Sequence, residues 1–403
     1  MRIHKNLAFT TIDSLQMIFN DGEYADKVVA KALKKDKRWG SHDRKFVAET
    51  IYDIVRWKRL YAEIAQVKAP FSRDDYWKMF AVWAVLRGYP LPEWKYFEET
   101  PVRRIKGKFD ELSKTRRLKE SIPDWMDELG VKELGEELWS KELTAQNKSA
   151  DVILRVNRLK TTPKELHAKL FDIDIETITH PDYPDALILE KRANVFLNDY
   201  FKAGLFEVQD ASSQLVAPFL DIQPGMRVVD ACAGAGGKTL HMASIMQNKG
   251  QIIAMDLYES KMKQLKLRAK RNGAFNIEYR IIDSTKVIKK LHDKADRLLI
   301  DAPCSGLGVL KRNPDSKWKL EPEFIENIKK TQQEILQNYS KMLKSGGKMV
   351  YATCSVLPSE NIEQINTFLV SEEGKKFKFV KDKAIFAHQT GFDGFYMALL
   401  EKL

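Results

Sequence analysis

The second half of the chain alternates short apolar runs with helix-like segments, and no other feature of the sequence constrains the fold as strongly. The apolar runs are 227–230, 252–256, 277–282, 297–301 and 348–353. Strands joined by helical crossovers lie parallel in one sheet that is covered on both faces. We therefore expect a Rossmann-like, doubly wound α/β domain over 205–403. A helix over 322–343, stopped by Gly346-Gly347, should precede the last run.

Two regions of different character precede this alternation. Apolar residues such as Val47, Ile51 and Ile54 share one helical face, which predicts an all-α region over 1–130. Between 150 and 204, strand-like runs at 152–156, 173–178 and 186–189 surround a helix that Thr162-Pro163 opens. This pattern predicts a small α+β domain. A chain of 403 residues is too long for one ordinary core, so a multidomain protein is expected.

The charge of the chain favours a polyanionic partner. The formal net charge is +11, and lysine and arginine gain free energy by displacing counterions from phosphates. Arg44, Arg56, Lys58 and Arg59 lie among apolar helical positions, and residues 103–119 hold eight basic and two acidic side chains. Each group is either a solvated helix face or an RNA-backbone contact surface, and the sequence leaves both interpretations open.

Cysteine content and hydropathy indicate a reducing, aqueous compartment. The longest clearly apolar run, 79–86, has eight residues, whereas a bilayer span needs roughly 20. Residues 1–5 are polar where a signal peptide would turn apolar. Only Cys232, Cys304 and Cys354 occur, and no His/Cys pair has zinc-ligand spacing. We expect a cytoplasmic protein without a metal site or a membrane partner.

A glycine-rich loop follows the first apolar run. Its residues are Ala231, Cys232, Ala233, Gly234, Ala235, Gly236, Gly237, Lys238 and Thr239. Glycines let the backbone approach a ligand closely, and the helix that follows offers free N–H groups. The next run ends in Asp256, where a carboxylate can bind both hydroxyls of a ribose. Asp283, after the third run, is placed to reach an adenine edge. These features predict a nucleoside cofactor, either a nicotinamide dinucleotide or S-adenosyl-L-methionine.

The fourth and fifth runs each lead into a loop that contains a cysteine. The two segments read Asp301-Ala-Pro-Cys304-Ser-Gly-Leu-Gly308, continued by Lys311, Arg312, Lys317 and Lys319, and Tyr351-Ala-Thr-Cys354-Ser355, continued by Pro358, Glu360 and Asn361. Ligands of open α/β sheets gather at the carboxyl ends of the strands, so Cys304 and Cys354 should lie over the nucleoside crevice. A thiolate there is a strong nucleophile. A redox disulfide or a metal site would need a C-x-x-C pair or a third soft ligand.

These motifs resemble those of the Sun/Nop-type RNA cytosine-5 methyltransferases, including the RsmB-like members. The segments 232–239, 301–315 and 351–355 are similar in order and spacing, and 393–398 extends the likeness to the end of the chain. The likeness is strong over 150–403. It is looser at 22–25 and 43–47, which look like a NusB-like helical domain. Gly234-Ala235 stand where the commoner family loop has Ala-Pro, so this loop lacks a proline that would stiffen it.

The resemblance implies roles for individual residues. Cys354 would attack ring carbon 6 of cytosine, and Cys304 would assist release of the methylated product. Asp301 and Lys238 would hold the polar edge of the base and contribute to the cofactor site. Asp256 would bind the ribose, and Asp283 the adenine, of S-adenosyl-L-methionine.

The same resemblance implies a division of labour along the chain. It assigns 1–130 to a NusB-like RNA-binding domain, 150–204 to an RRM-like domain and 205–403 to the catalytic domain. The expected partner is small-subunit ribosomal RNA, with transfer RNA left open, and the expected state is a monomer. Two rivals remain. One is a DNA cytosine-5 methyltransferase that uses Cys304 of a Pro-Cys motif, and the other is a non-catalytic RNA-binding or ribosome-assembly factor.

Overall fold

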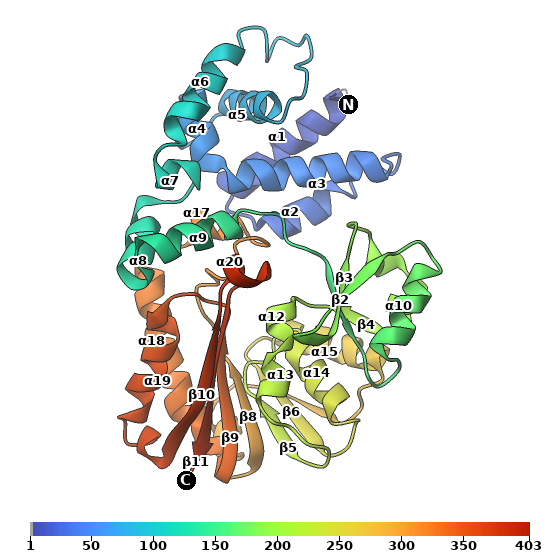
Figure 1. Ribbon diagram of the computed structural model, residues 1–403, viewed down its shortest axis with the longest axis vertical. Coiled ribbons are helices and arrows are strands. Elements are labelled where there is room, and N and C mark those ends of the chain that lie inside the picture. Colours follow the sequence, from blue (N-terminus) through green and yellow to red (C-terminus); the bar gives the residue numbers. More distant parts are fainter. Residues whose placement is uncertain (1–2) are drawn as a thin grey trace. The chain divides into compact units, whose positions relative to one another are not determined.

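The computed structural model describes residues 3–403, which form two compact units (Figure 1). The helical unit consists of Met1–Lys148 together with Leu310–Pro322, and the second unit, called the α/β unit below, consists of Ser149–Val309 together with Glu323–Leu403. The segment 310–322 therefore belongs to the helical unit, although the sequence places it within the second half of the chain. Among residues 3–403, no helix combines the length and the apolar character that a bilayer span requires.

The helical unit confirms the predicted all-α region. Its helices are α1 (Lys5–Phe19), α2 (Ala25–Ala32), α3 (Ser41–Arg56), α4 (Lys58–Ala65), α5 (Arg73–Leu86), α6 (Val102–Leu112), α7 (Arg116–Lys119), α8 (Asp124–Leu134), α9 (Glu136–Gln146) and α17 (Ser316–Lys319). Helix α5 is nearly wholly apolar in its second half and forms the centre of the core, where Trp77 stacks on Tyr96 with ring centroids 4.3 Å apart. Ser72 caps this helix by accepting the Asp75 N–H, which ends the preceding loop at a defined residue.

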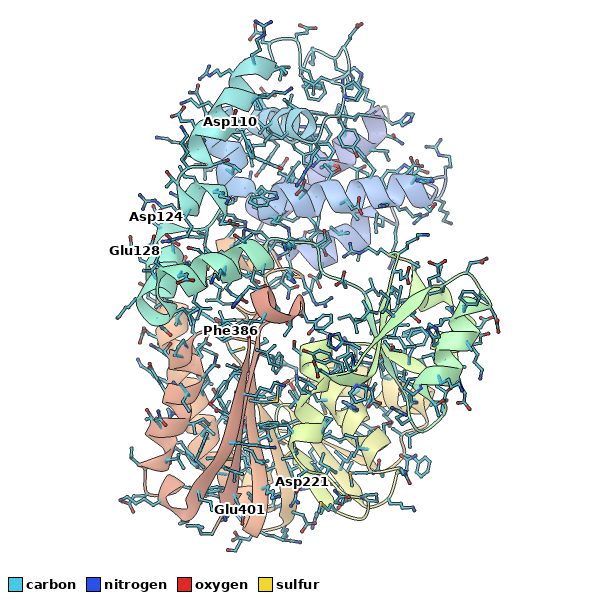
Figure 2. All side chains as sticks on the ribbon, viewed as in Figure 1. Asp110, Asp124, Glu128, Asp221, Phe386 and Glu401 are labelled. Atoms are coloured by element: carbon cyan, nitrogen blue, oxygen red, sulfur yellow. The ribbon has the colours of Figure 1, made fainter. Side chains whose placement is uncertain are left out.

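The basic residues of the helical unit do not behave alike. Arg59 pairs at 2.8 Å with the exposed side chain of Asp124, which Figure 2 labels, and Lys58 lies over the ring of Trp318. Arg44 donates to the backbone carbonyl groups of two nearby loop residues. Arg56 is buried, and its guanidinium donates to the carbonyl groups of Gln146 and Lys311. For Arg56 both interpretations that the sequence leaves open, a solvated face and an RNA contact, are therefore wrong.

The α/β unit begins with a four-stranded antiparallel sheet. Its strands are β1 (Ile153–Val156), β2 (Thr177–His180), β3 (Tyr183–Leu189) and β4 (Phe206–Val208), in the order β2-β3-β1-β4. Helix α10 (Pro163–Phe171) packs on this sheet, and Thr162 caps it as the sequence indicates. Strand β4 lies beyond residue 204 and pairs with β1, so the expected domain boundary at that residue falls inside the small sheet.

The large sheet has the predicted doubly wound arrangement. Its strands are β5 (Arg227–Asp230), β6 (Gln251–Asp256), β7 (Ile277–Ile281), β8 (Ala295–Asp301), β9 (Leu343–Thr353), β10 (Phe377–Ile385) and β11 (Phe395–Lys402), in the order β10-β11-β9-β8-β5-β6-β7. Strands β5 to β9 run parallel, and β10 and β11 are antiparallel additions at one edge. The carboxyl ends of β5, β6, β8 and β9 therefore meet at one edge of the sheet.

Helices bury both faces of this sheet. One face packs against α13 (Val216–Phe219), α14 (Gly237–Ile245) and α15 (Glu259–Asn272), and the other packs against α16 (Thr285–Lys289), α18 (Pro322–Tyr339) and α19 (Ile362–Leu369). The ribbon shows α14 and α15 on the opposite side of the strands from α18 and α19 (Figure 1). Alternate residues of the central strands, such as Val228 and Val229, point into these two cores.

The end of helix α18 differs from the prediction. The helix stops at Tyr339, a 3-10 turn covers Ser340–Met342, and β9 already begins at Leu343. Gly346-Gly347 therefore lie inside a strand and do not end a helix. The register between β8 and β9 shifts near the start of β9, and glycines fit such an irregularity because it bends the chain.

Candidate active site

The glycine-rich loop and Asp256 lie together, as the sequence predicts. The Asp256 carboxylate accepts the Gly234 N–H at 2.8 Å and the Tyr258 N–H at 2.9 Å. Gly236 has a φ of +87°, and a Cβ there would come within 2.0 Å of the Leu265 side chain on α15. Only glycine fits at this position, because the turn needs the left-handed region and the helix packs directly against it.

Two arginines hold the backbone of this loop, and sequence reasoning missed both. Arg268 on α15 donates to the Ala235 carbonyl at 2.7 Å, and the buried Arg155 on β1 donates to the Gly237 carbonyl. Glu207 on β4 in turn binds Arg268 at 2.9 Å. The commoner loop has a proline at the position of Ala235, and its ring would limit the φ angle and so stiffen the loop. In this chain, the hydrogen bonds from the two arginines to carbonyl groups of the loop restrain its backbone instead.

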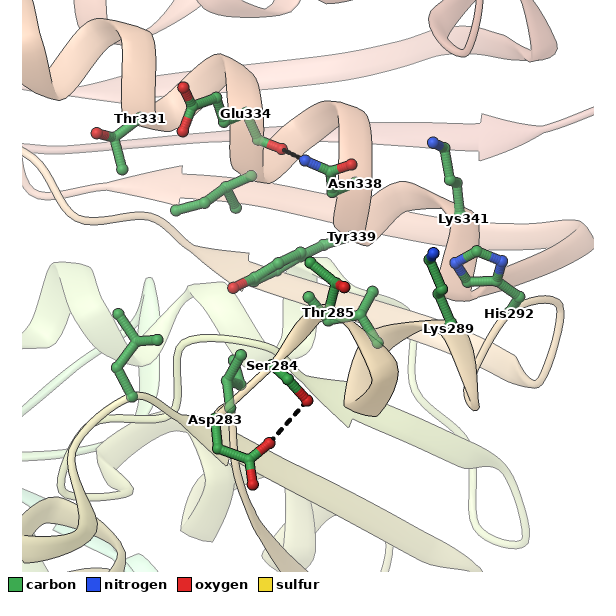
Figure 3. Close-up of a pocket in the computed structure, with 14 residues that line it drawn as sticks. Asp283, Ser284, Thr285, Lys289, His292, Thr331, Glu334, Asn338, Tyr339 and Lys341 are labelled. Carbon is green, nitrogen blue, oxygen red and sulfur yellow. Dashed lines mark hydrogen bonds between the residues drawn. The ribbon is translucent and has the colours of Figure 1, made fainter.

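A cavity of about 510 Å³ opens beside the ends of β6 and β7. Leu257, Ile282 and Asp283 line the part that follows these strands, and Tyr339 lines the side formed by α18 (Figure 3). The Asp283 carboxylate accepts the Ser284 hydroxyl at 3.0 Å. Apolar side chains beside a carboxylate suit a flat heterocycle with amino groups at its edge, so Asp283 lies where an adenine-binding residue is expected.

Lys238 and Asp301 form an ion pair at the ends of β5 and β8. The Lys238 Nζ lies 2.7 Å from Asp301 Oδ2, and the ammonium also lies over the Phe395 ring. Both side chains are partly exposed, which leaves the pair accessible to a ligand. The structure thus brings together two residues that lie 63 positions apart in the chain.

Asp230, the last residue of β5, is a site residue that the sequence analysis did not select. Its side chain is buried, and Oδ2 accepts the Thr239 hydroxyl at 2.7 Å, while Oδ1 has no partner among the described residues. Burial, with smaller contributions from Asp301 and Asp256, raises the pKa of Asp230 to about 7. The sequence did contain a signal for Asp230, because a polar residue ends an apolar run directly before the glycine-rich loop.

The unpaired Asp230 oxygen also tests whether the site fits the predicted cofactor. S-adenosyl-L-methionine carries an ammonium and a sulfonium group, and a buried carboxylate beside the glycine-rich loop suits a cationic ligand. Asp256 and Asp283 provide acceptors where a ribose and an adenine are expected. The residues present therefore fit the cofactor.

The sulfur atoms of Cys304 and Cys354 lie 3.4 Å apart. Hydrogen bonding to Cys354, together with burial, raises the pKa of the Cys304 thiol well above its usual range. Burial, with the nearby carboxylates, also raises the pKa of Cys232. Cys304 and Cys232 therefore keep their protons at neutral pH.

Close backbone contacts join the two cysteine loops to the loop that leads into β11. The Gly308 N–H donates to the Cys354 carbonyl at 2.8 Å, and the Gly394 N–H donates to the Gly308 carbonyl at 2.7 Å. A Cβ on Gly308 would lie 2.2 Å from the Gly394 oxygen. The segments 301–315, 351–355 and 393–398 thus meet at one point, and Gly308 must be glycine because backbone surrounds it.

Comparison with known proteins identifies the family. Residues 217–401 match the sequence profile described as 16S rRNA methyltransferase RsmB/F, and residues 122–196 match the ferredoxin-like domain profile of RsmF/B-like methyltransferases. A probable ribosomal RNA small subunit methyltransferase B from Synechocystis is 34% identical over 303 residues, which cover 70% of this chain and 67% of the relative. A probable enzyme of the same name from Bacillus subtilis is 32% identical, with 75% and 69% covered.

Solved structures agree with the fold. The crystal structure of PH0851 covers 100% of both chains with a TM-score of 0.85 and 26% identity. A methyltransferase homologue from Pyrococcus horikoshii is 24% identical, has a TM-score of 0.64 and covers 72% of this chain and 98% of its own. The fold and the glycine-rich loop thus define a Rossmann-like methyltransferase. This chain belongs to the RsmB/F family of 16S rRNA methyltransferases, whose methyl donor is S-adenosyl-L-methionine, and the predicted family, fold class and cofactor are confirmed.

Proposed function

We propose that this protein methylates carbon 5 of a cytosine in small-subunit ribosomal RNA through a covalent bond to Cys354. The observation that carries the proposal is the pair of thiols 3.4 Å apart at the carboxyl ends of β8 and β9. Two cysteines at this distance suit a reaction in which one sulfur binds the base and the other acts on the same adduct. Family membership supports RNA as the substrate.

The place of Cys354 in the motif 351–355 supports it as the nucleophile. Hydrogen bonding to Cys354 and burial raise the pKa of Cys304, so Cys304 keeps its proton and can donate a hydrogen bond to the Cys354 sulfur. Attack of the Cys354 sulfur on ring carbon 6 makes carbon 5 electron-rich enough to accept a methyl group. Loss of the carbon-5 proton and expulsion of the sulfur then complete the reaction, with Cys304 assisting release.

Lys238 and Asp301 are proposed to hold the base. Cytosine presents an amino donor beside ring acceptors, and a carboxylate paired with an ammonium offers the complementary groups. The bound cofactor supplies an electrophilic methyl group. The base must leave its helical stack to enter such a site, as in other enzymes that act on bases.

Covalent trapping tests this proposal. RNA that contains 5-fluorocytosine blocks loss of the carbon-5 substituent, so an enzyme that acts through a thiolate should remain attached to it. We expect the adduct in the wild type and in Cys304→Ala, and no adduct in Cys354→Ala. An adduct that survives in Cys354→Ala, or that forms with substituted DNA and depends on Cys304, would overturn the assignment. Bisulfite sequencing of RNA from cells lacking the protein would locate the cytosine and separate ribosomal from transfer RNA.

A further inference from the structure

Each cysteine loop continues with a buried serine, and both serines bind the same carboxylate. Ser305 follows Cys304, Ser355 follows Cys354, and Glu360 lies at the end of a 3-10 turn, η3 (Pro358–Glu360). The exposed fractions of Ser305, Ser355 and Glu360 are 6%, 0% and 0%. A buried carboxylate therefore lies between the residues that directly follow the two thiols.

The contacts of Glu360 divide between the two loops. Its Oε1 accepts the Ser305 N–H at 2.8 Å, and its Oε2 accepts the hydroxyl groups of both Ser305 and Ser355. The two serine oxygens lie 3.3 Å apart. One side chain thus fixes a backbone position in the Cys304 loop and a side-chain position in the Cys354 loop at the same time.

Helix α18 restrains both Glu360 and the backbone of the Cys304 loop through Gln332. The Gln332 Nε2 donates to Glu360 Oε1 at 3.2 Å and to the Pro303 carbonyl at 3.0 Å. Glu360 therefore accepts from four donor groups, and these hydrogen bonds offset the free-energy cost of burying a polar side chain. All of these contacts lie within the α/β unit.

The backbone around Glu360 is fixed as well. The Tyr351 hydroxyl donates to the Glu360 carbonyl at 2.8 Å, and the Asn361 side chain donates to the Ser355 carbonyl at 3.0 Å. Asn361 also accepts the Thr353 hydroxyl. Because η3 is anchored to β9 in this way, the backbone of Glu360 is held in place relative to β9.

We propose that Glu360 is a positioning residue that sets the distance between the sulfurs of Cys304 and Cys354. It touches neither thiol, and it acts by holding Ser305 and Ser355 at one point. The catalytic consequence rests on the proposed function, whereas the spacing of the thiols does not. A displacement of about 1 Å in a reacting group can cost roughly 100-fold in rate, so this spacing matters for any chemistry that uses both sulfurs.

Disulfide trapping measures the spacing without RNA or cofactor. Diamide oxidises two neighbouring thiols to a disulfide, takes up the two hydrogens and is itself reduced to a hydrazine. We expect the wild type to form the Cys304–Cys354 bond, identified by peptide mapping against Cys232. Glu360→Gln should form it at least about 10-fold more slowly, because an amide group cannot accept from all four donors. Cys304→Ala gives the background.

A matched control separates positioning from loss of stability. Glu142 is also fully buried, but it lies in the helical unit, so Glu142→Gln changes a buried carboxyl group outside the unit that carries the thiols. This variant should cross-link at the wild-type rate. If Glu360→Gln fails to fold, Ser355→Ala replaces it, with Ser340→Ala as the control at another fully buried serine. Wild-type cross-linking in a folded Glu360→Gln or Ser355→Ala protein would overturn the proposal.

Kinetics then link the spacing to catalysis. Glu360→Gln should lower kcat about 100-fold, leave the KM for S-adenosyl-L-methionine within about 2-fold and lengthen the lifetime of the RNA adduct, because release needs Cys304 in place. A variant that cross-links slowly and yet keeps the wild-type kcat would overturn the catalytic role. If the wild type does not methylate cytosine at all, the proposed function fails, and the cross-linking result still decides the spacing.

Discussion

Each unit buries an ionisable side chain that binds several partners, and the two side chains differ in what they hold in place. In the α/β unit, Glu360 binds the residues next to two thiols. In the helical unit, Lys317 is 1% exposed, and its Nζ donates to the Arg56 carbonyl at 2.9 Å and to Asn147 Oδ1 at 3.1 Å. Neither of these partners is a nucleophile. We therefore infer that Lys317 stabilises the fold of the helical unit and has no part in chemistry.

The same sequence motif supplies both clusters. Its first part, through Gly308, carries Cys304 and Ser305, whereas its continuation over 310–322 belongs to the helical unit. There, Lys317 and Arg56 bind carbonyl groups, and Asp315 accepts the Ala25 N–H at 3.1 Å. The basic residues that follow the motif include Lys317, which therefore has a structural role. A run of basic residues after a motif cysteine is not by itself evidence of a phosphate-binding surface.

The largest expected effect on stability comes from Lys317→Met. The change removes a buried amino group and leaves the Arg56 carbonyl and the Asn147 side chain without this donor, so the free energy of unfolding should fall by about 3–5 kcal/mol. Denaturant unfolding followed by circular dichroism measures this loss. The cross-linking rate of Cys304 with Cys354 should stay unchanged below the transition, because Gly308 already fixes the end of the Cys304 loop.

Lys141→Met is the matched control for this prediction. Lys141 lies in the same unit on α9 and pairs with Glu137 on the surface, where such a pair contributes at most about 1 kcal/mol. Equal losses for the two variants would show that burial of Lys317 has no special energetic role. A slowed cross-link in Lys317→Met would show that the two clusters are not independent.

The next largest effect is on the pH dependence of stability, and it concerns Asp230. This buried carboxyl group accepts from one hydroxyl donor, whereas Glu360 accepts from four donors. Its pKa, raised by burial to about 7, exceeds the ordinary value of 3.8. Between these values the folded protein binds the proton more tightly than the unfolded chain, so stability falls as the pH rises through this window and levels off above it. In Asp230→Asn this contribution disappears. The difference in unfolding free energy between wild type and variant should change by on the order of 3 kcal/mol from pH 4 to pH 8.

Asp221 provides the opposite sign for comparison. It lies near the amino ends of the strands (Figure 2), and its hydrogen bond to Lys348 lowers the pKa of its carboxyl. Stability from this pair is present above the ordinary carboxyl pKa and is lost as the pH falls. Asp221→Asn should therefore reduce stability only toward neutral pH. Parallel pH profiles for the two variants would refute the predicted role of burial at Asp230.

Much of this site is predictable because strand ends are marked in the sequence. Buried parallel strands appear as apolar runs, and their carboxyl ends must meet at one edge, so the sequence alone predicts that Asp256, Cys304 and Cys354 lie at the same edge. The predicted strand 227–230 coincides with β5. The motif residues lie within a few positions of these strand ends, so their spacing along the chain is enough to predict which edge of the sheet they occupy.

The supporting contacts are not predictable, because they join residues that are distant in the chain. Ser305 and Glu360 are 55 positions apart, and Arg155 and Gly237 are 82 positions apart. In the sequence, Glu360 is only one of several polar residues that follow the last predicted strand, 348–353. Arg56 has the pattern of a surface charge there, since a single sequence does not show the carbonyl groups that surround a buried cation.

The smallest expected effect tests whether hydrogen bonds replace the missing proline of the cofactor loop. Arg268→Met removes the donor to the Ala235 carbonyl, so the loop gains freedom, and the Kd for S-adenosyl-L-methionine, measured by calorimetry, should rise about 10-fold. The turn uses a bond from the Gly236 N–H to the Ala233 carbonyl at 2.9 Å and does not need the Ala235 N–H. Ala235→Pro in the same variant should therefore recover part of the affinity by fixing φ. Lys266→Met, an exposed change on the same helix, should leave the Kd unchanged, and equal affinities for Arg268→Met and Lys266→Met would mean that the arginine does not restrain the loop.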